Sequence, residues 1–147
     1  MVINGVKIES ILTELERIQK LSEDRSKQTA AIIINPKGER IFACNNYTAG
    51  VDITDEKYHL RPEKYLYIEH AERNAIYRAA KKGISIHRAT MICTWFPCVE
   101  CARAIIKSGI KRLYYLEEPV AELRLFSFDK SLELLKLAGV KHEKLER

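Results

Sequence analysis

Hydrophobic residues recur at two different spacings along the chain, and these spacings predict where helices and strands alternate. The first helix is expected over residues 7–23, where apolar side chains follow helical spacing at Ile8, Ile11, Leu12, Leu15 and Ile18. Two short apolar runs follow at 29–35 and 39–44, and the Asn-Pro-Lys-Gly sequence at 35–38 is typical of a turn. These runs are therefore predicted to form a β-hairpin.

The second half of the chain repeats this alternation. Helices are predicted over 69–82, 98–108 and Phe126–Ala138, and strands over 89–94, 112–116 and 140–145. A glycine follows each of these helices, at positions 83, 109 and 139, where glycine commonly ends a helix. Pro97 suits the first turn of the helix over 98–108. Residues 45–68 show no regular spacing and are interpreted as a long connecting loop with a short helical turn.

The resulting order, α-β-β-α-β-α-β-α-β, predicts a single domain over residues 1–147. Strands that alternate with helices indicate an α/β fold, here a layered sandwich with a mixed five-stranded sheet. A chain of 147 residues can bury a core without disulfide bonds. Its 46% hydrophobic and 31% charged residues are typical of soluble globular proteins.

Apolar content, charge and cysteine spacing narrow the class of protein further. No apolar run approaches the roughly 18 residues of a membrane span, and no signal-peptide pattern opens the chain, so a cytoplasmic protein without a membrane partner is expected. The net charge of +5 fits either a solvated Lys and Arg surface or positive charge that meets an anionic substrate, phosphate or nucleic acid. In a cytoplasmic chain, a Cys-x-x-Cys pair is more often a metal or redox site than a disulfide.

Two short segments contain the candidate chemistry, namely His70-Ala71-Glu72 and the run from Pro97 to Cys101. A catalytic zinc ion keeps three protein ligands and leaves a fourth position for water. Cys98 and Cys101 lie three residues apart at a predicted helix start, where both sulfurs can face one point and the helix N-terminus favours thiolates. His70 lies at the start of the preceding helix. If both helices pack on one face of the sheet, the three ligands can meet at one catalytic zinc ion.

Glu72 is the candidate catalytic residue. It follows His70 by two residues at a helix start, so its carboxylate can reach a water on the metal without binding the metal itself. Zinc lowers the pKa of such a water toward about 7, and a neighbouring carboxylate can carry the released proton to a substrate. Cys44 and Cys93 lie in apolar strands and are interpreted as buried small side chains.

Together, the His-x-Glu and Pro-Cys-x-x-Cys segments match the paired motif of zinc nucleobase deaminases. The stretches at 70–76 (His-Ala-Glu-Arg-Asn-Ala-Ile) and 94–102 (Thr-Trp-Phe-Pro-Cys-Val-Glu-Cys-Ala) resemble the cytidine and deoxycytidylate deaminase family, in its deoxycytidylate deaminase-like branch. The likeness covers roughly residues 30–140, and residues 51–69 depart from the typical sequence of that branch. It implies a three-layer α/β/α sandwich, one catalytic zinc ion and a homo-oligomer of at least two copies.

The resemblance also implies which residues contact the substrate. Asn45 corresponds to an asparagine that contacts the sugar, and Asn46 is the alternative for that position. Trp95 and Phe96 precede the first cysteine, where the family lines its base pocket. The remaining implied substrate contacts are Ala71, Thr94 and Arg73. For Arg73, a salt bridge within the protein is the favoured interpretation, and contact with a phosphate or ribose is the alternative.

The activity that the resemblance implies is hydrolytic deamination of a cytosine ring, with deoxycytidylate (dCMP) converted to dUMP and ammonia. A small nucleotide or nucleoside is thus the expected partner, and Arg61 and Lys64 are candidates for contacts with a phosphate. The same chemistry on adenosine in tRNA, or on a purine or free base, is the alternative. The leucine-rich stretch at 126–139 favours packing over RNA binding, so nucleic acid is the less favoured partner. A non-catalytic zinc-binding module is an alternative of another class, against which Glu72 argues.

Overall fold

Five strands form one mixed sheet at the centre of the computed structural model, which describes residues 1–118 and 127–147. The strands are β3 Ala30–Ile34, β4 Arg40–Cys44, β7 Thr90–Trp95, β8 Arg112–Glu117 and β9 Lys141–Lys144. They lie in the order β4-β3-β7-β8-β9. β3 is antiparallel to both β4 and β7, whereas β7, β8 and β9 run parallel. The predicted hairpin and mixed five-stranded sheet are thus confirmed.

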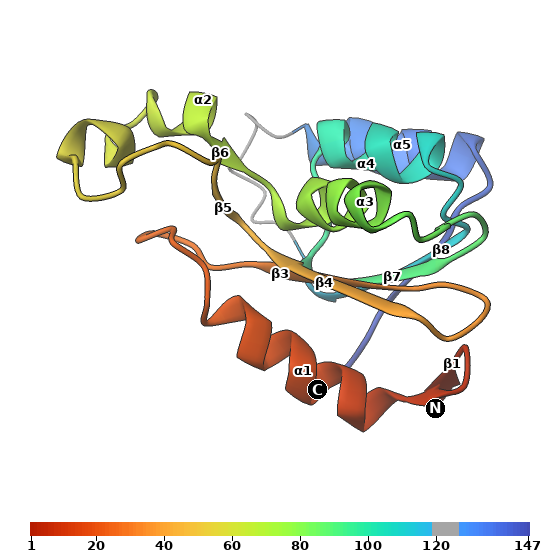
Figure 1. Ribbon diagram of the computed structural model, residues 1–147. Coiled ribbons are helices and arrows are strands. Elements are labelled where there is room, and N and C mark those ends of the chain that lie inside the picture. Colours follow the sequence, from red (N-terminus) through yellow and green to blue (C-terminus); the bar gives the residue numbers. More distant parts are fainter. Residues whose placement is uncertain (119–126) are drawn as a thin grey trace.

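Helices cover both faces of this sheet, so the three-layer α/β/α prediction is also confirmed (Figure 1). α1 Ile8–Gln19 lies on one face, and the other face carries α3 Ala71–Lys82, α4 Val99–Lys107 and α5 Phe128–Leu137. A short hairpin of β1 Val2–Ile3 and β2 Val6–Lys7 precedes α1. α1 ends earlier than predicted, because the chain leaves the helix at Lys20. Phe126, where the last helix was expected to begin, lies outside the described residues.

The side chains of β3 explain why the sheet needs helices on both faces. Ala31 and Ile33 belong to the core on the side of α3 and α4, whereas Ile32 and Ile34 belong to the core on the side of α1. Successive residues of a strand point to opposite faces, and both sets here are fully buried. A strand buried on both faces has a continuous apolar sequence, as the run from Ala30 to Ile34 does.

The sheet order brings several chain segments to the carboxyl end of β7. Because β3 runs antiparallel to β7, the segment that leads into β3 lies beside the end of β7. The backbone N–H of Ala30 donates to Thr94 Oγ1 at 3.1 Å, which closes this edge. β4 pairs with β3 so that Cys44 lies opposite Ala30, and the end of β4 therefore reaches the same edge. The loop over residues 20–29, the residues after β4 and the cysteine loop after β7 meet here.

Residues 48–67 form an arm that projects from the body of the domain (Figure 1). The prediction of a long loop with a helical turn for this region is correct only in part, because its two ends pair as strands. β5 Asn46–Tyr47 and β6 Ile68–Glu69 are antiparallel at the base of the arm, and η1 Glu56–His59 and α2 Lys64–Tyr67 lie within it. The backbone N–H of Thr48 donates to Tyr67 O at 3.0 Å and continues this pairing into the arm.

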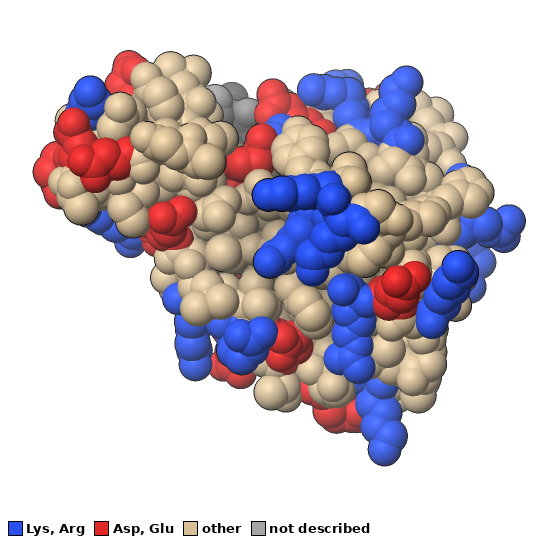
Figure 2. All heavy atoms as spheres, in the orientation of Figure 1, with Lys and Arg blue, Asp and Glu red and all other residues tan. Residues whose placement is uncertain are grey.

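The surface carries charges of both signs. Figure 2 shows Lys and Arg spread over the body of the domain with Asp and Glu among them, and a group of acidic side chains on the projecting arm. This face therefore lacks the continuous basic stripe that is typical of nucleic-acid-binding proteins. No helix in the described residues combines the length and the apolar character needed to cross a membrane.

Candidate active site

Two helix N-termini meet beyond the carboxyl end of β7, and each begins at a candidate metal ligand. His70 is the N-cap residue of α3 and Cys98 is the N-cap residue of α4, both with extended backbone. α3 therefore begins two residues later than predicted, and Pro97 precedes α4 instead of lying in its first turn. Cys101 follows in the first turn of α4 and is fully buried. The two helix starts thus bring the three predicted ligands together.

The three ligand atoms have the spacing of a zinc site. Sγ of Cys98 and Sγ of Cys101 each lie 3.4 Å from Nδ1 of His70. In tetrahedral zinc coordination, with Zn–S near 2.3 Å and Zn–N near 2.0 Å, a sulfur and a nitrogen ligand are roughly 3.5 Å apart. Within the described residues, no fourth His, Cys, Asp or Glu joins this group. Three protein ligands with one open position are the arrangement of a catalytic zinc site rather than a structural one.

The electrostatic environment favours the thiolate form of Cys98, whereas the hydrogen bond with Cys98 and burial raise the pKa of Cys101. A hydrogen bond with Cys101, together with the neighbouring His70, lowers the pKa of the Cys98 thiol to about 4. The backbone N–H of Cys101 also points at the Cys98 sulfur, 3.5 Å away, as N–H groups at a helix N-terminus do. Cys98 is therefore a thiolate at neutral pH, which is the form that binds metal.

Glu72 lies in the first turn of α3, one residue beyond the helix start. Its side chain is only 6% exposed and lines the same cavity as His70 and Cys98. Burial raises the pKa of this carboxyl above its usual range, although the charge of His70 and a hydrogen bond with Cys101 act in the opposite direction. A carboxyl group with a raised pKa can accept a proton and release it again near neutral pH. This is the behaviour expected of a general acid–base catalyst.

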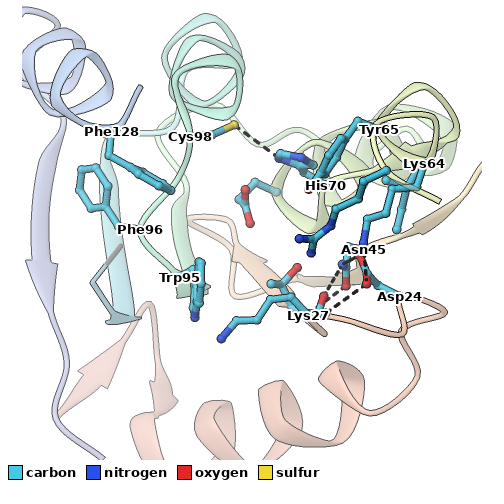
Figure 3. Close-up of a pocket in the computed structure, with 14 residues that line it drawn as sticks. Asp24, Lys27, Asn45, Lys64, Tyr65, His70, Trp95, Phe96, Cys98 and Phe128 are labelled. Atoms are coloured by element: carbon cyan, nitrogen blue, oxygen red, sulfur yellow. Dashed lines mark hydrogen bonds and ion pairs between the residues drawn. The ribbon is translucent and has the colours of Figure 1, made fainter. Parts of the chain in front are cut away.

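A cavity of about 230 Å³ opens in front of these residues. Figure 3 shows Trp95, Phe96 and Phe128 on one side of it and Asp24, Asn45 and Lys64 on the other, with Cys98 and His70 between them. Phe96 is held by an edge-on contact with Tyr115, with ring centroids 5.0 Å apart. The cavity therefore has an apolar, aromatic wall and a polar wall. A ligand with a flat ring at one end and polar groups at the other fits this division.

Asp24 and Lys64 form a buried ion pair in the polar wall. Their side chains are 7% and 5% exposed, and Lys64 Nζ lies 3.1 Å from Oδ1 and 3.2 Å from Oδ2 of Asp24. Oδ1 of Asp24 also accepts the backbone N–H groups of Ser26 and Lys27. The net pKa of Asp24 is lowered, because these hydrogen bonds and Lys64 outweigh the opposing effect of burial. The pair ties the arm to the loop that precedes β3.

Replacing Lys64 by methionine is expected to destabilise the fold, because it leaves the Asp24 carboxylate buried without a countercharge. Removing one partner of a buried ion pair costs about 3–5 kcal/mol. Urea unfolding of the variant measures this loss. Lys57→Met is the matched control in the same arm, since Lys57 pairs with Asp55 at the surface and its side chain is 65% exposed. Equal urea concentrations at the midpoint of unfolding for the two variants would contradict a role of the buried ion pair in stability.

Lys27 and Trp95 form a second polar feature at the cavity. The Lys27 ammonium lies 3.7 Å from the centroid of the Trp95 ring and 3.6 Å from Glu117 Oε2. The indole N–H of Trp95 donates to the same carboxylate oxygen at 2.7 Å. Both Lys27 and Trp95 line the cavity, and the Lys27 and Glu117 side chains are 44% and 46% exposed. Lys27 thus brings a positive charge that is within reach of a ligand.

The residues predicted to contact a substrate fall into two groups. Asn45, Trp95 and Phe96 line the cavity. The other three do not: Thr94 is buried in the sheet, Ala71 is buried in the core, and Arg73 forms ion pairs beside the site. For these three residues, contact with a substrate stays a prediction without support from the cavity.

Asn45 also has a structural role. Its Oδ1 accepts from the backbone N–H of Thr29 at 2.8 Å, and its Nδ2 donates to the carbonyl of Lys27 at 2.8 Å. The side chain therefore shapes the loop over 20–29 while facing the cavity. Asn46, the alternative for the sugar contact, accepts from Asn74 Nδ2 at 2.8 Å and does not line the cavity.

The sequence prediction did not include the contribution of the loop before β3. Asp24, Lys27 and Thr29 all line the cavity although no motif contains them. The mixed sheet was predicted without a strand order, and the antiparallel pairing of β3 with β7 is what places the residues before β3 beside the cysteine loop. The sequence offers no signal for Phe128 and Tyr65 either, which line the cavity from other segments.

Comparison with known proteins identifies relatives that match most of this chain. The family described as cytidine and deoxycytidylate deaminase zinc-binding region matches residues 6–117. A probable deoxycytidylate deaminase of Caenorhabditis elegans is 36% identical over 110 residues, which are 69% of this chain and 54% of that protein. Deoxycytidylate deaminase of Mus musculus is 32% identical over 136 residues, which are 84% of this chain and 70% of that protein. The chain thus spans about half the length of the nematode relative.

A solved structure has a similar fold over nearly its whole length. The dCMP deaminase of cyanophage S-TIM5 in complex with dCMP and dUMP superimposes with a TM-score of 0.75 and 25% sequence identity. The match covers 94% of this chain and 96% of the phage chain.

Proposed function

Because the chain belongs to the cytidine and deoxycytidylate deaminase family, we propose that it is a zinc-dependent deaminase that converts dCMP and water to dUMP and ammonia. One observation carries this proposal. The three zinc ligands His70, Cys98 and Cys101 leave one position open, and His70, Cys98 and Glu72 line the same cavity. The phage relative of similar fold is described in complex with dCMP and dUMP, which supports the choice of substrate.

In the proposed reaction, Glu72 moves the protons. Zinc, when bound, supplies the activated water that attacks C4 of the cytosine ring. The Glu72 carboxylate accepts a proton from that water and delivers it to N3 of the ring. It then takes the remaining proton from the new hydroxyl group on C4 and transfers it to the amino group, so that the C4 carbonyl forms, the C4–N4 bond breaks and ammonia leaves. Burial of Glu72 keeps the carboxyl out of contact with bulk water and raises its pKa, which suits repeated proton transfer.

The two walls of the cavity suit a pyrimidine nucleotide. Phe96, Trp95 and Phe128 offer aromatic surface to a base held near the metal ligands. Lys27 and Arg61 line the cavity as cations, and Arg61 forms no ion pair within the described residues. The charge of Lys64 is held in a buried ion pair with Asp24, whereas the longer pair between Lys27 and Glu117 is exposed to solvent. We therefore assign Lys27 and Arg61, rather than Lys64, to the phosphate of the nucleotide.

Replacing Lys27 by glutamine is expected to raise KM for dCMP about 10-fold or more, since a hydrogen bond to a charged group contributes about 1.5–3 kcal/mol. KM for deoxycytidine, which lacks the phosphate, should stay unchanged. Steady-state kinetics with both substrates measure this difference. Arg25→Gln is the control, because Arg25 lies in the same loop but pairs with Glu56 at the surface and does not line the cavity. Equal effects of Lys27→Gln on the two substrates would contradict the phosphate contact.

A panel of compounds distinguishes dCMP from other substrates that the same deamination chemistry could act on. Release of ammonia is measured with dCMP, CMP, deoxycytidine, cytosine, guanine and tRNA, together with the zinc content. We expect the highest kcat/KM with dCMP. α5 supports this expectation over tRNA, because Phe128, Leu132 and Leu135 of this helix pack into the core. Turnover of tRNA or a purine without turnover of any cytosine nucleotide would overturn the proposed substrate, and zinc binding without turnover of any compound would favour a non-catalytic zinc module.

We also propose that the chain acts as a homo-oligomer of at least two copies. The arm carries apolar side chains in contact with solvent, of which Leu60 is 60% exposed and Leu66 is 76% exposed. Apolar side chains grouped on a projecting segment are typical of an interface between proteins. Light scattering coupled to gel filtration tests this, and a monomer at micromolar concentration contradicts it.

The free cysteines support a cytoplasmic location. Cys44, Cys93, Cys98 and Cys101 are not in disulfide bonds, and disulfides are rare in reducing compartments. The proposed metal site needs the last two in reduced form, which a reducing compartment maintains.

A further inference from the structure

We infer that Arg73 is a positioning residue for the metal site, which clamps together the two helix starts that carry the zinc ligands. The inference rests on the zinc site of the proposed function and assigns Arg73 to that site instead of to the substrate. Arg73 is the residue between Glu72 and Asn74 in α3, and its side chain is 17% exposed. It forms two ion pairs that reach in different directions along the site.

The first ion pair fixes the start of α3. Nε of Arg73 donates to Oε1 of Glu69 at 2.6 Å, one helical turn back along the chain. The same Oε1 accepts the backbone N–H of the ligand His70 at 3.0 Å. Glu69 therefore holds the backbone of a zinc ligand, and Arg73 holds Glu69. Because Oε1 receives both bonds, a shift of Arg73 is transmitted to the backbone of His70.

The second ion pair reaches the other helix. Nη1 of Arg73 donates to Oε2 of Glu100 at 2.6 Å, and the two residues are 27 positions apart in the sequence. Glu100 stands between the ligands Cys98 and Cys101 in the first turn of α4. The planar guanidinium presents its N–H groups in a rigid fork, so one side chain can hold two carboxylates at a set separation. Lysine has a single ammonium group and cannot reproduce this span.

The clamp also contributes charge. The guanidinium lies near enough to Cys101 to interact with it electrostatically, so it places a fixed positive charge beside the ligand group. Residues outside the ligand set that orient ligands typically change metal affinity 10- to 100-fold when replaced.

The experiment measures zinc affinity of the full chain by competition with a chromophoric chelator, for Arg73→Ala, Arg73→Lys, Glu100→Gln and the double variant Arg73→Ala with Glu100→Gln. We expect Arg73→Ala to weaken zinc binding by about 10- to 100-fold, and the double variant to bind no more weakly than Arg73→Ala. Glu100→Gln is expected to weaken zinc binding less than Arg73→Ala does. Arg73→Lys is expected to bind zinc nearly as weakly as Arg73→Ala. Arg78→Ala is the matched control, since Arg78 lies on the same helix but donates to Phe42 O at 2.8 Å, away from the ligands.

Thermal unfolding of the metal-free variants and KM for dCMP separate the possible outcomes. An unchanged zinc affinity with a lower metal-free unfolding midpoint would show a packing role and overturn the inference. Unchanged zinc affinity with a raised KM for dCMP would assign Arg73 to substrate binding instead of to the metal site. Wild-type zinc affinity in Arg73→Lys would show that a positive charge alone suffices at this position. If Arg73→Ala does not fold, Glu100→Gln decides, because Glu100 is a surface side chain at 58% exposure. A wild-type chain that binds no zinc overturns the proposed metal site itself.

Discussion

Replacement of Glu72 by glutamine is expected to lower kcat for deamination by about 10²–10⁴-fold, the range over which general acid–base catalysis contributes. Glutamine has nearly the shape of glutamate but cannot accept and release a proton at neutral pH. Because the side chain is only 6% exposed, the amide should remain in the carboxylate's position. Single-turnover measurements with dCMP, together with zinc content by atomic absorption, test this expectation.

Zinc binding and folding should be retained in the Glu72→Gln variant. Glu72 does not belong to the ligand group, and the loss of a buried carboxyl removes a group that is costly to ionise in the interior. Glu143→Gln on β9 is the control for the loss of one negative charge, because Glu143 is exposed at the far edge strand of the sheet. Full activity of Glu72→Gln would refute the assignment of Glu72 as the proton carrier.

Replacement of Cys101 by alanine is expected to abolish both zinc binding and activity. The zinc content should fall from one ion per chain to near zero, since two protein ligands do not hold zinc as three do. The stabilisation of the wild type by zinc should also disappear. That stabilisation amounts to about 4 kcal/mol when free zinc exceeds its Kd 1,000-fold. Thermal unfolding with and without added zinc measures it.

Cys93→Ala is the matched control for this experiment. Cys93 is also fully buried, but its Sγ donates to the carbonyl of Trp95 at 2.9 Å and is not part of the ligand group. Both variants lose a buried thiol, so the comparison isolates the metal from the packing. We expect Cys93→Ala to keep one zinc ion and its zinc-dependent stabilisation. A Cys101→Ala variant with full zinc content would disprove the ligand set.

Periodicity was sufficient to predict the main elements of the fold. α1, α3, α4 and the five central strands lie where the spacing of apolar residues indicates them, because that spacing directly reports which side chains face a core. The predicted ends differ from the observed ones by at most four residues. Helix ends depend on local backbone contacts, such as the one between Cys101 N–H and Cys98 Sγ, which the spacing of apolar residues does not report.

The metal ligands were equally accessible from the sequence. His70 and Cys98 are the N-cap residues of two helices, and Cys101 lies in the first turn of the second. The distances of 3.4 Å between the sulfurs and Nδ1 of His70 depend on the packing of α3 beside α4. Arg73 had two interpretations in the sequence, and its ion pairs with Glu69 and with Glu100 on the neighbouring helix favour the salt bridge.

The sequence by itself therefore determined the layers of the fold and the candidate residues for metal binding and proton transfer, since both follow from short-range patterns. Only the tertiary structure decided the shape of the cavity. In its polar wall, Asp24 pairs with Lys64, which lies 40 residues away in the sequence. The ammonium of Lys27 lies over the ring of Trp95, which belongs to a distant strand. Contacts between such distant segments depend on the sheet order and on how the arm folds back. Such contacts produce no periodic pattern of apolar residues in the sequence, because a single ion pair involves two residues and not a repeated set along one face of a helix or strand.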